Sequence, residues 1–123
     1  MESGRLFPIE YVQEIPLIHV SGDLDYASAP ILKSTILHLL SAHSTRIILD
    51  LDKVAFIDSG GMSAIIFAIK KLSELSGHLY LVNCTPRVVQ KLKIGGLTNI
   101  GHTLVVCKSP GDAIRNIQHQ QSI

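Results

Sequence analysis

A serine directly after an aspartate stands where an apolar, strand-like run gives way to an amphipathic helix. The junction is Asp58-Ser59-Gly60-Gly61, and the apolar residues after it recur at spacings of three and four. A hydroxyl or carboxylate here can cap the helix by accepting a hydrogen bond from a first-turn amide. The hydroxyl can also serve as a docking or modification group. The two glycines favour this second use, because each costs up to about 1 kcal/mol relative to alanine in a helix interior.

An acidic loop is expected beside this serine. Gly22-Asp23-Leu24-Asp25 follows an apolar segment at 15–20, which we predict to be the strand next to the one that leads to Ser59. Ligand and partner sites in parallel sheets cluster at the carboxyl ends of the strands. The pattern therefore predicts that the acidic loop and Ser59 form one site.

The sequence offers little support for an enzyme. It contains no Gly-x-Gly-x-x-Gly, no phosphate-binding loop and no Gly-x-Ser-x-Gly elbow. The six histidines show no metal-ligand spacing, and nothing in sequence gives Ser59 a neighbouring general base. We therefore expect no catalytic residue, no metal and no cofactor. Cys84 and Cys107 are interpreted as small buried residues in a reducing compartment rather than a disulfide or metal pair.

Composition indicates one globular domain, 1–123, with its core at about 6–117. The chain has 123 residues, 46% of them hydrophobic and 17% charged, and a formal net charge of +1. That charge provides no field to attract nucleic acid or an anionic membrane. No apolar run approaches the roughly 20 residues that span a bilayer, and residues 1–5 lack a signal-peptide pattern. We expect a cytoplasmic protein, monomeric or weakly dimeric.

Apolar periodicity and turn residues predict an α/β fold with a mostly parallel sheet of four to five strands and about four helices. Its first two strands form an antiparallel pair joined by a tight turn at Gln13-Glu14. Thr85-Pro86 and Ser109-Pro110 are typical helix starts, with a capping hydroxyl before a proline. The expected strands are 6–12, 15–20, 46–51, 79–82 and 104–107, and the expected helices are about 26–42, 59–76, 85–95 and 109–119.

Four segments in this order resemble the STAS domain, the family of bacterial anti-sigma factor antagonists and sulfate-transporter tails. They are Gly22 to Asp25, the apolar strand Ile47 to Leu51, Phe56 to Met62, and Asn83 to Pro86. The resemblance covers nearly the whole chain, from about Leu6 to Ile117. Its Asp-Ser element is the specific part.

This resemblance implies a phosphorylation switch at Ser59. A cognate anti-sigma factor, itself a serine kinase, would phosphorylate Ser59. The unphosphorylated protein would bind that anti-sigma factor and free the sigma factor, and a phosphatase would reset the switch. Asp25 and Asp58 match acidic family positions beside the serine. Gly60 is a departure, because many members carry a second Ser or Thr there.

The partner would dock on the exposed start of the Ser59 helix and its adjoining loops. For Met62, a place in the core is an equal alternative because of its spacing on the apolar face. The candidate partner-binding residues are Asp23, Asp25, Tyr26, Ser28, Asp58, Gly60, Gly61, Met62 and Ser63.

Two other functions remain open. The chain could be a STAS subunit or module of a transport ATPase or other signalling complex, docking through the same helix end without phosphorylation. It could also be a small-molecule-binding or hydrolytic domain with Ser59 as nucleophile, although no base or oxyanion motif is visible.

Overall fold

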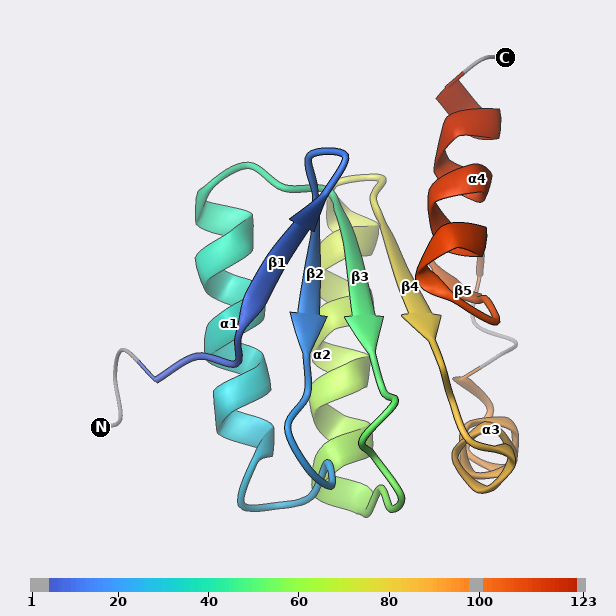
Figure 1. Ribbon diagram of the computed structural model, residues 1–123. Helices are drawn as coiled ribbons and strands as arrows, with labels where there is room; N and C mark the ends of the chain where they lie inside the picture. The colour runs from blue at the N-terminus through green and yellow to red at the C-terminus, as the bar shows by residue number, and fades with distance from the viewer. Residues whose placement is uncertain (1–4, 98–100, 122–123) are drawn as a thin grey trace.

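A five-stranded sheet in the order β1-β2-β3-β4-β5 forms the centre of the computed structural model (Figure 1). The structure describes residues 5–97 and 101–121, so expectations about residues 1–4, 98–100 and 122–123 lie outside the described residues. Its elements along the chain are β1 (Ile9–Val12), β2 (Ile15–His19), α1 (Ala29–Ser41), β3 (Arg46–Asp50), α2 (Ser59–Glu74), β4 (His78–Val82), α3 (Pro86–Ile94), β5 (Leu104–Val106) and α4 (Pro110–Gln121).

The predicted fold class is confirmed. β1 and β2 pair antiparallel with Val12 opposite Ile15, whereas β2, β3, β4 and β5 pair in parallel. Gln13 and Glu14 have φ angles of 50° and 70°. Left-handed backbone at both central residues gives the two-residue hairpin turn that matches the twist of the strands.

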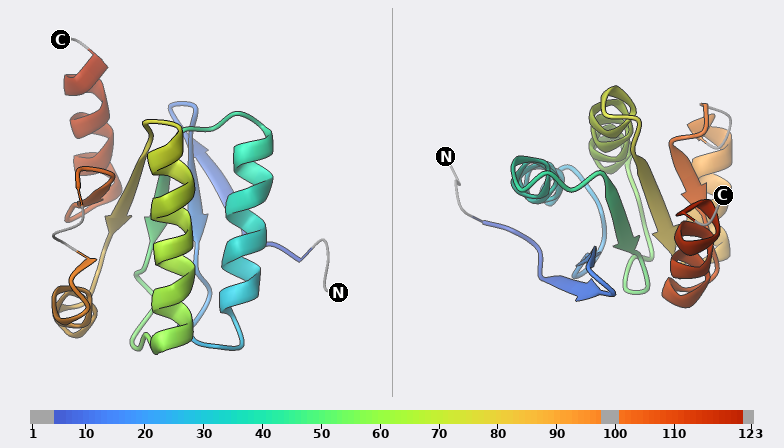
Figure 2. Two further views of the ribbon diagram at one scale, coloured as in Figure 1. Left: turned by 180° about the vertical axis from the view of Figure 1, so that it is seen from behind. Right: turned by 90° about the horizontal axis from the view of Figure 1, so that it is seen from above.

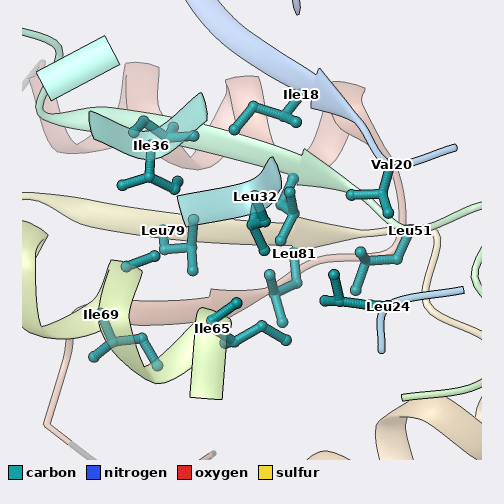
Figure 3. Packing of buried hydrophobic residues seen from close by; sticks show 14 of the residues in the cluster. Ile18, Val20, Leu24, Leu32, Ile36, Leu51, Ile65, Ile69, Leu79 and Leu81 are labelled. Atoms are coloured by element: carbon teal, nitrogen blue, oxygen red, sulfur yellow. The ribbon is translucent and has the colours of Figure 1, made fainter. Parts of the chain in front are cut away.

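Helices cover the two faces of the sheet unequally. α1 and α2 lie together on one face, and α4 lies on the other, as the views from behind and above show (Figure 2). The larger core forms under α1 and α2, where strand residues such as Leu79 and Leu81 meet Leu32 of α1 and Ile65 of α2 (Figure 3). The smaller core under α4 consists of Leu17, Ile48, Tyr80, Val82, Ala113, Ile114 and Ile117.

The first helix begins three residues later than predicted. The amide of Asp25 donates to Ser28 Oγ, and Asp25 Oδ1 accepts from the amides of Ala27 and Ser28, all at 3.0 Å. These local bonds hold residues 25–28 in a turn that competes with the helix. The first strand also starts late, at Ile9 rather than residue 6.

The other helix starts follow the capping rules. Thr85 Oγ1 accepts from the amide of Val88, and Ser109 Oγ accepts from the amide of Asp112, both at 3.2 Å. Cys84 and Cys107 are free, half-buried thiols. Among residues 5–97 and 101–121, no helix has the length and hydrophobicity that a membrane crossing requires.

Candidate functional site

The candidate site lies where β2 and β3 end side by side. Parallel pairing places His19 opposite Asp50, so the loop after β2 and the segment after β3 leave the sheet at the same edge (Figure 1). The segment after β3 leads directly into α2, whose first residue is Ser59. The predicted neighbourhood of the acidic loop and Ser59 is therefore present.

Backbone bonds join the two segments around Leu24, which is fully buried. Leu24 and Ile57 form a parallel bridge. The Leu24 amide donates to the Phe56 carbonyl at 3.1 Å, and the Asp58 amide donates to the Leu24 carbonyl at 3.3 Å. These bonds extend the sheet beyond the ends of β2 and β3 and fix the start of α2 against the loop.

The carboxylates of Asp23 and Asp25 accept hydrogen bonds that stabilise the loop after β2. Asp23 Oδ1 accepts from the amides of Ala55 and Phe56 at 3.0 and 3.1 Å, which ties the loop to the segment before α2. Asp25 holds its own turn, as described above, and Ser28 Oγ donates to the Asp23 carbonyl at 2.9 Å. Asp23, Asp25 and Ser28 thus shape the loop, and any contact with a partner would be additional to that role.

Asp58 caps α2. Its Oδ1 accepts from the Gly61 amide at 3.0 Å, and its Oδ2 accepts from the Tyr26 amide at 3.1 Å. The Gly61 amide is the main cause that holds the pKa of the Asp58 carboxyl below its usual value, with smaller contributions from the amides of Tyr26 and Gly60 and from the positive charge of Lys91. Asp58 therefore stays ionised at neutral pH.

Ser59 is exposed, and its hydroxyl forms no hydrogen bond with any residue that the structure describes. The sequence allows either the Asp58 carboxylate or the Ser59 hydroxyl to cap α2. In the structure the Asp58 carboxylate is the cap. No histidine forms a hydrogen bond with Ser59 in the described part of the chain, and no group of three potential metal ligands occurs there. The Ser59 hydroxyl is thus accessible, and no side chain of the described residues forms a hydrogen bond with it.

Gly60 and Gly61 have a packing reason that the sequence does not reveal. A Cβ on Gly61 would lie 2.2 Å from the Leu24 carbonyl oxygen, and one on Gly60 would lie 2.7 Å from the Tyr26 Cα. Such distances are far inside van der Waals contact. The glycines let the start of α2 approach the loop after β2, so they are not by themselves evidence for a modified serine.

The remaining candidates differ in exposure. Tyr26 is 82% exposed, and Ser63 is exposed one turn after Ser59. Met62 is half-buried against the larger core, and its Cε lies 2.4 Å from where a Cβ on Gly95 would be. The side chain of Met62 therefore packs between α2 and the end of α3. This position agrees better with a place in the core than with a place on the docking surface.

One feature of this surface is absent from the sequence prediction. A hollow of about 300 Å³ lies beside the segment that leads to Ser59, between that segment and α3. The segment and α3 are about thirty positions apart, and only the fold brings them together. A weak sequence signal exists, because Ile94 is a large apolar residue that lies off the predicted inner face of its helix, and Phe56 lies beyond the predicted strand 46–51. The hollow is lined by Ala55, Phe56, Ile57, Arg87, Val88, Gln90, Lys91 and Ile94.

Known proteins share this architecture. A family model described as the STAS domain matches residues 7–110. An anti-sigma-B factor antagonist of Staphylococcus aureus is 25% identical over 85 residues, which are 69% of this chain and 79% of that protein.

Two solved structures share the fold at low sequence identity. A crystal structure from Thermotoga maritima superposes with a TM-score of 0.83 at 22% identity, covering 91% of this chain and 94% of that one. The Bacillus cell fate determinant SpoIIAA, solved in its phosphorylated form, superposes with a TM-score of 0.67 at 21% identity, covering 90% and 98%.

Proposed function

This chain belongs to the STAS domain family, and from that premise we propose that it is an anti-sigma factor antagonist switched by phosphorylation of Ser59. The unphosphorylated protein binds an anti-sigma factor that is also a serine kinase, and so frees the sigma factor. Phosphorylation ends this binding. The names of its relatives, among them an anti-sigma-B factor antagonist, support the partner class.

The observation that carries the proposal is the free hydroxyl of Ser59. A kinase needs an accessible acceptor whose loss of the O–H group leaves the fold intact. Ser59 is exposed and unbonded within the described residues, while Asp58 beside it supplies the cap. Modification of Ser59 therefore costs the helix no hydrogen bond.

A phosphate on Ser59 would change the charge of the surface more than its shape. It adds about −1.5 to −2 charges at pH 7. The amino end of α2 stabilises an anion by about 0.3–1 kcal/mol, whereas the ionised Asp58 opposes it. The buried residues of α2, such as Ala64 and Ile65, face away from the change. We expect a phosphorylated protein that stays folded.

The same charge would weaken partner binding. A contact made to a bare hydroxyl would have to desolvate and accommodate a dianion. A penalty of about 3–4 kcal/mol lowers affinity by two to three orders of magnitude.

The test is binding to each candidate anti-sigma kinase of the same genome, with and without ATP. Wild type should bind, incorporate phosphate on Ser59 and dissociate. Ser59→Ala should stay bound, and Ser59→Asp should bind weakly. Ser63→Ala is the matched control, because it removes an exposed serine one turn away and should still be phosphorylated. If no kinase modifies the protein and all variants bind alike, the chain is a STAS module that docks without a switch.

A further inference from the structure

The hollow beside α3 has a mostly apolar lining. We call it the α3 groove, with the lining residues given above. Phe56 and Ile94 are 49% and 74% exposed, so two large apolar side chains meet water on either side of it. Exposed apolar surface that gathers around a concave site is typical of a binding surface.

The charges of the α3 groove are all positive. Arg87 and Lys91 are its only ionisable lining residues, and no salt bridge within the described residues involves either of them. Arg87 and Lys91 are four positions apart on α3, and Ile94 follows three positions later. These spacings place the three side chains on one face of the helix, in a line of two cations and one apolar group.

We propose that the α3 groove binds a segment of the partner protein in which a large apolar side chain is flanked by carboxylates. This inference rests on the proposed function and names the chemistry of the partner. The apolar side chain would fill the groove between Phe56 and Ile94, and the carboxylates would pair with Arg87 and Lys91. Two cations about one helical turn apart match two carboxylates on a peptide, whereas a fatty acid offers only one.

The position of the α3 groove links it to the switch. Phe56 and Ile57 line it and are directly followed by Asp58 and Ser59. Lys91 is close enough to Asp58 to contribute to its lowered pKa. A phosphate on Ser59 would therefore stand at the end of the α3 groove and repel the carboxylates of the bound segment. One modification could in this way weaken a contact wider than the serine itself.

A peptide titration tests the α3 groove without any kinase. The probe is a helical peptide of roughly 15 residues with one leucine and a glutamate one turn to each side; its control carries lysines in place of the glutamates. Backbone NMR shifts at 55–57 and 87–94 should respond to the glutamate peptide and much less to the lysine peptide. Equal responses, no response, or larger shifts with laurate at the same concentration would each overturn the proposal.

A second experiment uses the kinase identified above. Arg87→Glu/Lys91→Glu should weaken binding of the unphosphorylated protein at least about tenfold, while the circular dichroism spectrum shows that the variant is still folded. Lys93→Glu is the matched control, an exposed lysine of the same helix outside the α3 groove, and should bind like wild type. If wild type binds and is phosphorylated while the double variant matches Lys93→Glu, the groove proposal fails and the proposed function stands. If no kinase binds wild type, the proposed function fails, and the peptide titration still decides for or against the groove.

Discussion

Asp58 joins two segments that are 32 positions apart, because its Oδ2 accepts a hydrogen bond from the Tyr26 amide at 3.1 Å. Its Oδ1 at the same time caps α2 through the Gly61 amide. One carboxylate thus fixes both the helix start and the loop after β2. The hydroxyl of the neighbouring Ser59 forms no hydrogen bond with any described residue, so we expect the fold to survive a chemical change of that hydroxyl.

Substitution of Asp58 should therefore destabilise the protein, and substitution of Ser59 should not. Asp58→Ala removes both acceptors and should lower the thermal midpoint by several degrees. Ser59→Ala should change the free energy of unfolding by less than about 0.5 kcal/mol. Thermal unfolding by circular dichroism measures both. Equal losses in the two variants would mean that Ser59 shares the capping role.

The stabilising effect of Asp58 should disappear in acid. Its pKa is lowered in the folded protein from 3.8, so protons bind the unfolded chain more readily. The contribution of Asp58 to the free energy of unfolding is therefore fully present above its pKa in the unfolded chain. It is lost as the pH falls through its lower pKa in the folded protein. The gap in stability between wild type and Asp58→Asn should be constant above about pH 5 and narrow below pH 4. Urea unfolding at a series of pH values measures it; a gap that persists to the lowest pH would contradict the assignment.

The sequence predicts the elements of this fold well because their signals are local. The cap and proline at Thr85-Pro86, the turn at Gln13-Glu14 and the acidic residue before Ser59 each act within a few positions. The sequence does not predict the late start of α1. Residues 26–28 are compatible with a helix, but in the structure the hydrogen bonds between Asp25 and Ser28 hold them in a turn instead. The role of Gly61 and the α3 groove depends on segments far apart in the chain, which no local pattern describes.

Gly61 should tolerate no side chain. A Cβ there would lie 2.2 Å from the backbone oxygen of Leu24, which cannot swing away as a flexible side chain could. Gly61→Ala should cost about 1–3 kcal/mol of unfolding free energy. Gly111→Ala is the control, since its Cβ would meet only side-chain atoms at 3.8 Å and the change raises helix propensity. Equal stabilities of the two variants would show that the backbone at Leu24 can move to accommodate the added methyl group at little cost.

Asp23 should protect the segment before α2 from solvent exchange. Its Oδ1 accepts from the amides of Ala55 and Phe56, so Asp23→Ala frees both. Hydrogen–deuterium exchange followed by NMR should show faster exchange at these two amides. Asp52→Ala is a suitable control, because Asp52 is an exposed acid of the same segment whose carboxylate accepts no hydrogen bond within the described residues. Unchanged exchange in Asp23→Ala would mean that other contacts hold the segment.

Cys84 should be nearly inert in the folded protein. Burial is the main cause that raises the pKa of its thiol from 9.0 to about 11, and the charge of Asp50 adds to it. Because the thiolate is the nucleophile, two pKa units reduce its population at pH 8 by roughly a hundredfold. Alkylation by iodoacetamide at pH 8 should therefore be about a hundred times slower in native protein than in urea, as peptide mass spectrometry would measure. Burial is also the main cause that raises the pKa of the Cys107 thiol, so Cys107 should likewise react more slowly in the native protein than in urea. A native Cys84 that reacts as fast as in the unfolded chain would show that the end of β4 opens readily to solvent.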